Sequence, residues 1–412
     1  MRVALVVQRF GIEVNGGSET LARRIAERIA ENVDLTVLST CALDYSTWAN
    51  YYPPGRTDVN GVEVLRFPVR TPRDQAKFDA ISVAAYATPN DPELGKRWMQ
   101  AQGPDAPELL DYLRTRGGSY DAVAFMTYLY ATTAEGLPLV ADRSLLVPTV
   151  HDEPPLRLRL FDDIFAFPRL LLFSTPEERD LARRRFGVED ERARLVGVGV
   201  DEPPESDPSR FRAESGVGDR PYAIYVGRLD PSKGVLDLVE HHRRYREAAD
   251  KPLDLVLIGG GEIDLPDEPW LHVLGFVSEQ QKHDAVAGAE VVVLPSPYES
   301  LSLVQLEAWM HGRPTLANAE SPVLAGQSSR GSGGLWYENA SEYAVMLDFL
   351  GRSRPLGDAI GRQGRRYVRS AFTWRSVRDR WLDALAEVGG SAELRSSAAD
   401  ESKHDVNASR RR

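Results

Sequence analysis

The sequence predicts an α/β protein made of two domains with parallel sheets, and three observations support this. In the first half, short apolar runs alternate with amphipathic stretches, as in "VALVV" followed by "SETLARRIAERIAEN". The pattern breaks at residues 197–220, which are rich in Pro, Gly, Ser and acidic residues, and a second alternating series begins at "YAIYVG". Such alternation is typical of parallel sheets covered by helices on both faces. A chain of 412 residues also suits two domains of roughly 200 residues better than one core.

The elements of the first half follow from its apolar runs. The predicted strands are, in order, "VALVV", "LTVLS", "VEVLRF", "AVAFM", "LLVPTV" and "LLLFS". The first run is closed by Arg9, so it reads as a buried strand and is too short for a signal peptide. Residues 45–60 are aromatic, proline-rich and non-periodic, which predicts a long loop where strands end.

The second half repeats the pattern after the predicted linker at 197–220. Its strands are "YAIYVG", "LDLVLIG", "HVLG", "VVVLP" and "PTLAN", and its helices are expected at 233–248, 278–287, 302–312, 355–371 and 374–388. Residues 390–412 lack apolar periodicity, which predicts a disordered tail.

Composition narrows the class of function. The formal net charge of -11 argues against general nucleic-acid binding, although a local basic pocket for a small anion stays compatible with it. Cys41 is the single cysteine, which fits a reducing, cytoplasmic location and a packed thiol rather than a catalytic one. No run reaches the ~18 apolar residues of a membrane span, so contact with a membrane, if any, would be peripheral, at the inner face.

The stretch "YAIYVGRLDPSKG" places two cations directly after a predicted strand. Ligands of open α/β sheets bind at the carboxyl ends of strands, and with two such domains the natural site is the cleft between them. The strand ends at Gly227, and Arg228 and Lys233 follow before a helix. The N-terminus of a helix carries a partial positive charge, so cations are electrostatically disfavoured there. Two cations at such a place therefore favour a binding site for a diphosphate over a pair of merely solvated side chains.

The stretch "VVVLPSPYESLSLVQLEAWMHG" adds two carboxylates. Glu299 precedes the helix predicted at 302–312, whose first residues Ser302 and Leu303 offer unpaired N–H groups to an anion. Glu307 lies on an apolar stripe of this helix, where a carboxylate needs a partner. Hydroxyls of a bound polyol would suit both glutamates; for Glu307 the alternative is an Arg or backbone partner.

Other loops supply further candidate residues. Phe276, in "GFV", could present backbone groups to a planar base, with core packing as the alternative. Gly16 and Gly17, in "GIEVNGGSET", permit close approach to a phosphate or substrate, but this loop is not the GxGxxG dinucleotide fingerprint. His151, in "VPTVHDEPP", could contact a ligand or be structural, and its two adjacent acids cannot complete a metal site from one short loop. We therefore expect no metal.

Taken together, "GGSE", "HD", "GVGVD", "GRLDPSKG", "GGGE", "GFV" and "PYESLSLVQLEAWMHGRPTLAN" resemble, in order and spacing, the retaining glycosyltransferases of family 4, the group 1 glycosyl transferases. The resemblance covers about residues 1–385. It implies a GT-B fold of two Rossmann-like domains facing each other across a cleft. Its parts would be an acceptor domain at 1–200, a donor domain at 201–370, a crossover helix at 371–389 packing on the first domain, and the tail at 390–412.

The resemblance also implies roles. Arg228 and Lys233 would bind the diphosphate of a nucleoside diphosphate sugar, Glu299 the sugar hydroxyls and Glu307 the ribose. His151 would lie near the sugar and Gly17 near the diphosphate. The reaction would be metal-independent and need no cofactor beyond this donor. The acceptor would be a carbohydrate or a lipid-linked molecule, in bacterial-type surface polysaccharide or glycoconjugate synthesis.

The chain departs from the family where Leu301 and Ser302 replace the usual Phe-Gly, which would narrow the space near the diphosphate. Alternative functions are a nucleotide-sugar epimerase, which would form product without an acceptor, and a sugar phosphorylase, which would use inorganic phosphate. A non-catalytic nucleotide-sugar binding protein would bind the donor without turnover.

Overall fold

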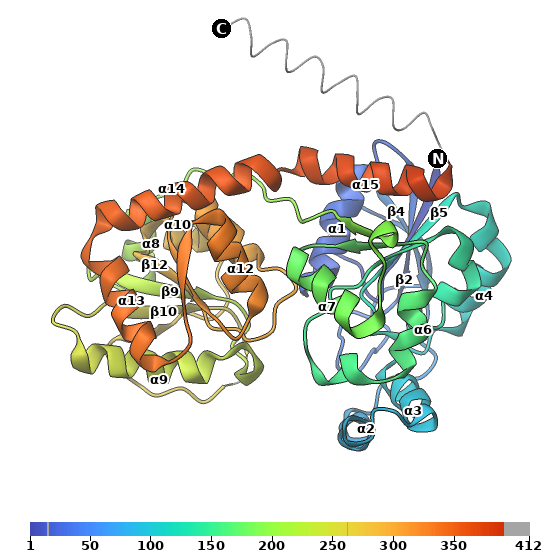
Figure 1. The fold of residues 1–412 in the computed structure, drawn as a ribbon, viewed down its shortest axis with the longest axis horizontal. Helices are drawn as coiled ribbons and strands as arrows, with labels where there is room; N and C mark the ends of the chain where they lie inside the picture. The colour runs from blue at the N-terminus through green and yellow to red at the C-terminus, as the bar shows by residue number, and fades with distance from the viewer. Residues whose placement is uncertain (15, 262, 391–412) are drawn as a thin grey trace, which may run out of the picture. The chain divides into compact units, whose positions relative to one another are not determined.

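The computed structural model describes residues 1–14, 16–261 and 263–390 and divides into two compact units. The first unit contains Met1–Gly197 together with the described residues after Trp374, and the second contains Val198–Trp374. Each unit has its own sheet with helices packed around it (Figure 1). The tail predicted at 390–412 lies, from residue 391 on, outside the described residues.

The first unit is built on an eight-stranded sheet in the order β3-β4-β2-β1-β5-β6-β7-β8. Its strands are β1 Arg2–Val6, β2 Asp34–Thr40, β3 Gly55–Val59, β4 Val62–Phe67, β5 Ala122–Met126, β6 Ser144–Val147, β7 Leu170–Phe173 and β8 Ala193–Leu195. Its α-helices are α1 Gly17–Ile29, α2 Gln75–Ala87, α3 Pro92–Gln102, α4 Pro107–Arg116, α5 Ala131–Ala134, α6 Leu160–Ala166, α7 Pro176–Phe186 and α15 Trp374–Gly389. All ladders are parallel except β3 with β4. The buried runs of β1, β5, β6 and β7 are those expected of strands covered on both faces.

The long loop predicted at 45–60 is wrong over its second half. Residues 55–59 form β3, which pairs antiparallel with β4 so that Val59 faces Val62. The turn between them is Asn60-Gly61, and both residues have positive φ. Asn-Gly favours a two-residue hairpin turn, so the sequence held a hairpin signal that the aromatic and proline-rich residues before it obscured.

Helix α15 brings the C-terminal part of the chain to the first unit. Its Glu387 pairs with Arg194 of β8, with 2.6 Å between Arg194 Nη2 and Glu387 Oε1. Near its end, Gly389 packs so closely on Met1 that an added Cβ would come within 2.4 Å of the methionine Cε. The expectation of a C-terminal helix that returns to the first domain is confirmed.

The second unit is built on a six-stranded parallel sheet in the order β11-β10-β9-β12-β13-β14. Its strands are β9 Tyr222–Val226, β10 Asp254–Ile258, β11 Leu271–Val273, β12 Val291–Leu294, β13 Thr315–Asn318 and β14 Gly334–Tyr337. Its α-helices are α8 Pro208–Ser215, α9 Val235–Ala248, α10 Glu279–Gly288, α11 Leu303–Met310, α12 Pro322–Gly331, α13 Ala340–Arg352 and α14 Arg354–Ala371. The strand β14 was not among the predicted strands.

The predicted linker at 197–220 contains a helix. Asp207 caps α8 by accepting a hydrogen bond from Ser209 N, Pro208 begins it, and Gly216 ends it in the left-handed conformation. Phe211 of this helix is 2% exposed. Helix boundaries are commonly marked by an acidic N-cap, a proline in the first turn and a glycine after the last turn, and this segment has all three. The prediction of a linker gave more weight to the polar composition of the segment than to these signals.

Alternate residues of β9 serve two cores on opposite faces of the second sheet. Ala223 and Tyr225 belong to a core shared with α9 and α13. Tyr222 and Ile224 belong to a core shared with α8, α10, α11 and α12. Because side chains of a strand point alternately to its two faces, a continuous apolar run is what a strand covered on both sides requires.

The core between α9 and α13 contains a buried imidazole, His242. Its Nε2 lies 3.0 Å from Leu253 O, which can only accept, so Nε2 carries the proton and Nδ1 accepts from Tyr343 Oη at 2.9 Å. Burial lowers the pKa of His242 to about 3. A second imidazole of this unit, His311, has its pKa lowered to about 4, again chiefly by burial.

We expect the second unit to lose stability on acidification. The folded-state pKa of His242 lies below its ordinary value of 6.5, so the unfolded chain binds more protons between the two values. Its stabilising contribution is therefore present above about pH 6.5 and is lost as the pH falls toward 3. Urea midpoints measured across this range should fall for the parent and fall less for His242→Gln. If the urea midpoint fell equally with pH in the parent and in His242→Gln, His242 would not be the group responsible for the loss of stability.

Candidate functional site at the carboxyl edge of the second sheet

The loops after β9 and β10 lie against each other at the carboxyl edge of the second sheet. Leu229 N donates to Gly260 O at 2.9 Å. A Cβ at Gly259, which has φ +140, would lie 1.8 Å from Gly227 O, and one at Gly261 would lie 2.0 Å from Leu229 O. Only glycine fits at positions 259 and 261. The glycine run is therefore explained by packing, because it lets the loop after β10 lie close to the loop that carries Arg228.

The loop after β9 presents the two predicted cations. Asp230 accepts from Ser232 N at 2.8 Å and begins the short 3-10 turn Pro231–Lys233. Hydrogen bonds from Ser232 lower the pKa of Asp230, with Arg228 and Lys233 adding to the effect, so this carboxylate is charged and helps to hold the loop. Arg228 is exposed at the edge.

Lys233 connects the loop after β9 to the loop after β12. Its Nζ lies 2.9 Å from Glu299 Oε1, and the two side chains are 28% and 19% exposed. Gly234, with φ +72, packs so that an added Cβ would lie 2.5 Å from Pro295 O, which brings the same two loops together through the backbone. Lys233 and Glu299 therefore share one site, at the edge where Arg228 also lies.

The helix that follows this edge is α11, and Ser302 is its N-cap residue. The Ser302 hydroxyl accepts from Gln305 N at 3.3 Å, and the residue is 7% exposed. The side chain that replaces the usual glycine is thus used as the helix N-cap. Leu303 is the first residue of the helix and is half-buried, and the helix follows Glu299 closely in the sequence.

Glu307 has a partner that the sequence did not predict. Lys282 Nζ of α10 lies 3.3 Å from Glu307 Oε2 and 2.7 Å from Glu279 Oε2. Burial by itself would lower the pKa of Lys282, but the two carboxylates outweigh it and raise the pKa. Glu307 is half-buried while Leu306 and Met310 on the same stripe are buried. Glu307 thus has a partner within the protein, as the alternative expected, but the partner is a lysine rather than an arginine or the backbone.

Phe276 is exposed rather than packed in the core. It is 79% exposed, and its ring lies over Gly260, where an added Cβ would come within 2.0 Å of Phe276 Cε2. The core-packing alternative for this residue is wrong. Since Gly260 also bonds Leu229, the exposed ring lies next to the loop that carries Arg228.

In the first unit, Gly16 and Gly17 precede and begin α1. A Cβ at Gly16 would lie 2.2 Å from Glu19 Oε2, whereas one at Gly17 would meet nothing within 4 Å. Glu19 is 4% exposed and accepts from Arg9 Nε at 2.9 Å and from Gln8 Nε2 at 2.8 Å. The glycine at position 16 is therefore explained by packing, because a buried ion pair occupies the space that a side chain would need. This pair was not predicted from the sequence.

His151 follows β6, where a buried carboxylate fixes the backbone. Glu178 accepts from Val150 N at 3.0 Å and from Ser174 N at 2.7 Å, so it joins the loops after β6 and β7. Burial raises the pKa of Glu178 to about 8, against the lowering effect of these hydrogen bonds. His151 Nε2 lies 3.2 Å from Glu153 Oε2, and the histidine side chain is 29% exposed.

Tyr128, which follows β5, is 1% exposed. Its hydroxyl donates to Glu153 Oε1 at 2.9 Å and its ring packs on Phe161. It belongs to the core of the first unit. Cys41 is likewise buried, as expected.

Neither a metal cluster nor a membrane-spanning helix occurs among the described residues. In the described part of the chain, no three His, Cys, Asp or Glu side chains are grouped as a metal site would require. No helix within residues 1–390, outside the two undescribed positions, combines the length and apolar character needed to cross a membrane.

Comparison with known proteins matches residues 220–347 to the family "Glycosyl transferases group 1". A curated relative, the alpha-D-kanosaminyltransferase of Streptomyces kanamyceticus, is 34% identical over 164 residues, which cover 36% of this chain and 42% of the relative. The chain thus spans less than half the length of that relative.

Solved structures match over nearly the whole chain. A sucrose-phosphate synthase from Thermosynechococcus elongatus has a TM-score of 0.69 at 17% identity, covering 94% of this chain and 98% of that one. The Anabaena protein HepE in complex with UDP has a TM-score of 0.67 at 16% identity, covering 94% and 100%. Likeness at this level of identity shows the fold, and the GT-B fold expected from the sequence is confirmed.

Proposed function

We propose, for a chain whose residues 220–347 belong to the group 1 glycosyl transferases, that it transfers a sugar from a nucleoside diphosphate sugar to a hydroxyl of an acceptor. The second unit would hold the donor and the first unit the acceptor. The transfer would retain the configuration at the anomeric carbon.

The observation that carries this proposal is the pair formed by Lys233 and Glu299 beside Arg228 at the start of α11. A diphosphate leaving group develops negative charge, which fixed cations and helix N–H groups stabilise best in a site with little water. Glu299, held by Lys233 at 2.9 Å, accepts hydrogen bonds, so it suits the hydroxyls of the sugar next to the diphosphate.

The proposed reaction breaks the bond between the anomeric carbon and the diphosphate oxygen, and both electrons leave with the nucleoside diphosphate. The acceptor oxygen forms the new bond to the same carbon from the face that the diphosphate leaves. The proton of the acceptor hydroxyl passes to a phosphate oxygen of the leaving group. Arg228 and Lys233 supply the positive charge, so the proposal uses neither a metal nor another cofactor.

Other residues would position the donor. Glu307 would accept hydrogen bonds from the ribose, with Lys282 holding its carboxylate in place. Gly227, Ser302 and Leu303 would contribute backbone next to the diphosphate. In the first unit, Gly17, with open space around its Cα, would lie near the diphosphate and His151 near the sugar.

The acceptor we propose is a carbohydrate or a lipid-linked sugar, in the synthesis of a surface polysaccharide or glycoconjugate. A lipid-linked acceptor would bring the protein to the periphery of a membrane at its cytoplasmic face. In residues 157–170, an apolar segment with scattered arginines, Phe161, Ile164 and Phe165 are buried and Phe167 is 39% exposed.

The proposal is tested by incubating the protein with a panel of nucleoside diphosphate sugars, with and without sugar acceptors. Release of nucleoside diphosphate, slow without acceptor and faster with it, is the expected result. The anomeric configuration of the product, assigned by NMR, should match that of the donor. An inverted product would refute retention. A changed donor sugar formed without acceptor would indicate an epimerase, and binding without any turnover would indicate a non-catalytic binder.

Replacing the exposed ring of Phe276 should weaken donor binding. Phe276→Ala is expected to raise the Kd for the preferred nucleoside diphosphate about tenfold, as for the loss of one stacked base. The matched control is Phe349→Ala, which removes another exposed ring, 51% exposed, from α13 of the same unit. Calorimetry on both variants measures the difference, and equal affinities for Phe276→Ala and the parent would exclude a base at this ring.

A further inference from the structure

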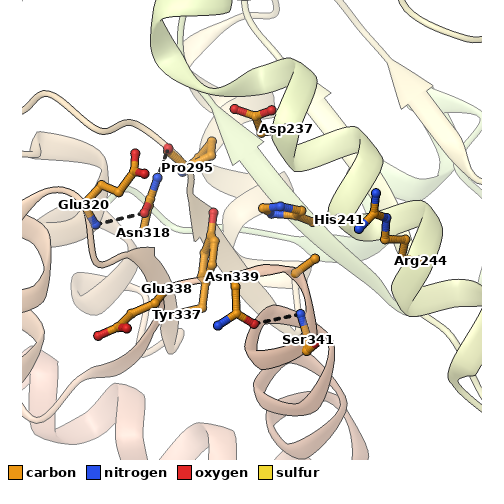
Figure 2. Close-up of a pocket in the computed structure, with 11 residues that line it drawn as sticks. Asp237, His241, Arg244, Pro295, Asn318, Glu320, Tyr337, Glu338, Asn339 and Ser341 are labelled. Carbon is orange, nitrogen blue, oxygen red and sulfur yellow. Dashed lines mark hydrogen bonds between the residues drawn. The ribbon is translucent and has the colours of Figure 1, made fainter.

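A pocket of the second unit contains none of the residues assigned to the donor. Its volume is about 540 Å³, within the range of about 300–1,000 Å³ usual for small-molecule sites. It is lined by α9, by the residues after β12 and β13, and by the junction between β14 and α13 (Figure 2). Asp237, which lines it, lies one helical turn after Lys233, so the pocket adjoins the donor loop without sharing its side chains.

A buried hydroxyl points into this pocket. Tyr337 is 2% exposed, and its hydroxyl oxygen is directed into the space between Asn318 and His241 (Figure 2). Over the described residues this hydroxyl has no hydrogen-bond partner. The buried Nδ1 of His241, on the facing helix, also lacks one among the described residues. Buried polar atoms are normally satisfied, so the buried, unpaired Nδ1 of His241 next to the tyrosine hydroxyl indicates a place that a ligand or water completes.

The charges around the pocket select the kind of ligand. Burial raises the pKa of Tyr337, and the carboxylates of Asp237 and Glu320, which line the same pocket, raise it further. Glu338 adds a third carboxylate to the lining. The one arginine in the lining, Arg244, is already paired with Glu240 at 2.8 Å. An anion would therefore be repelled here, in contrast to the cationic edge beside it.

The two amide side chains on this side are mostly engaged with the protein itself. Asn318 Nδ2 donates to Pro295 O at 3.0 Å and its Oδ1 accepts from Glu320 N at 3.0 Å. Asn339 Oδ1 accepts from Ser341 N at 3.1 Å as the cap of α13. The groups left to meet a ligand are mainly acceptors: the three carboxylates, and the tyrosine hydroxyl, which can accept as well as donate.

We propose that this pocket binds a sugar that carries no anionic group, and that an amino group on the sugar strengthens the binding. Sugar hydroxyls and an ammonium group are hydrogen-bond donors that match the carboxylates of Asp237 and Glu320, and a hydroxyl of the sugar would pair with Tyr337. The site lies wholly within the second unit and goes beyond the transfer reaction, because it binds its sugar without a nucleotide.

Saturation-transfer NMR on the full-length protein tests this with three probes: D-glucosamine, D-glucose and D-glucose 6-phosphate. We expect transfer to glucosamine and glucose, with glucosamine the tighter ligand, and none to the phosphate. Asp237→Asn and Tyr337→Phe keep the size of each side chain and should weaken glucosamine binding about tenfold or more, as for the loss of a hydrogen bond involving a charged group. The matched control is Glu247→Gln, which removes an equal charge from the outer surface of α9, where Glu247 pairs with Arg243.

Three results would overturn the proposal. The first is no saturation transfer to glucosamine or to glucose, and the second is an unchanged affinity for glucosamine in both Asp237→Asn and Tyr337→Phe. The third is loss of the sugar signal when UDP is added, since that would assign the sugar to the donor edge. Thermal melting of each variant shows whether it is folded. Nucleoside diphosphate binding by the same samples is measured separately, so failure of the sugar pocket and failure of the proposed transferase function are distinguishable.

Discussion

Lys233→Ala should reduce kcat/KM for the nucleoside diphosphate sugar about 10²–10³-fold, the usual effect of removing one group that stabilises charge in a transition state. The lysine lies at the carboxyl edge of the second sheet and holds Glu299 at 2.9 Å. Its loss removes a cation from the leaving diphosphate and leaves the Glu299 carboxylate, 19% exposed, without this partner. Both effects oppose the departure of an anion.

The matched control for this variant is Lys251→Ala, which removes an exposed lysine from the same unit. Steady-state rates with the preferred donor and acceptor measure both. We expect a large loss for Lys233→Ala and parental rates for the control. Parental rates for both variants would remove Lys233 from the site.

Trp309→Ala should lower the free energy of unfolding of the second unit by about 3–5 kcal/mol, as for other large buried aromatic residues. Trp309 is 0% exposed, and its Nε1 donates to Gly333 O at 2.8 Å. Added Cβ atoms at Gly333 and Gly364 would come within 2.5 Å and 2.4 Å of its ring, so those glycines make the room that it fills. The truncation leaves a cavity beneath α11, the helix that carries Ser302 and Glu307.

Urea unfolding of Trp309→Ala, compared with Trp336→Ala, measures this effect. Trp336 is 39% exposed in β14 of the same unit, so its removal should cost much less. If the two substitutions lowered stability equally, packing around Trp309 would not be what holds α11.

The sequence predicted the elements that have strong local signals. Continuous apolar runs predicted the central strands of both sheets, because strands covered on both faces need apolar side chains on both. Three of the elements it missed illustrate short or mixed signals: β3 follows two prolines, α8 lies in polar composition, and β14 is a four-residue strand at the edge of its sheet. For β3 and α8 the turn and capping residues were present and were outweighed by composition.

The candidate site was predictable where residues follow strands directly. Arg228, Lys233 and Glu299 come straight after β9 and β12, and neighbouring parallel strands bring their carboxyl ends together. The partners of buried charges were not predictable, because they depend on packing between elements. Lys282 reaches Glu307 from α10, and Arg9 reaches Glu19 from the first loop, with no spacing rule that connects them.

Phe276 shows the limit of reasoning from residue type. An aromatic residue between Gly275 and Val277 is most often in a core, yet this ring is 79% exposed. Gly275 has φ +66, a left-handed conformation that redirects the chain just before the ring. Backbone direction at a single glycine is decided by the fold around it.

The central claim is that the carboxyl edge of the second sheet binds a nucleoside diphosphate. The most direct test is calorimetry, in which nucleoside diphosphates are titrated into the parent protein, Lys233→Ala and Glu307→Ala. In Glu307→Ala, Lys282 keeps Glu279 of its own helix as a partner, and the apolar core that contains Val286 of α10 and Ala308 of α11 still joins the two helices. We predict that the parent binds at least one diphosphate and that both variants bind it at least about tenfold more weakly. Variants that bind it as tightly as the parent would contradict the claim.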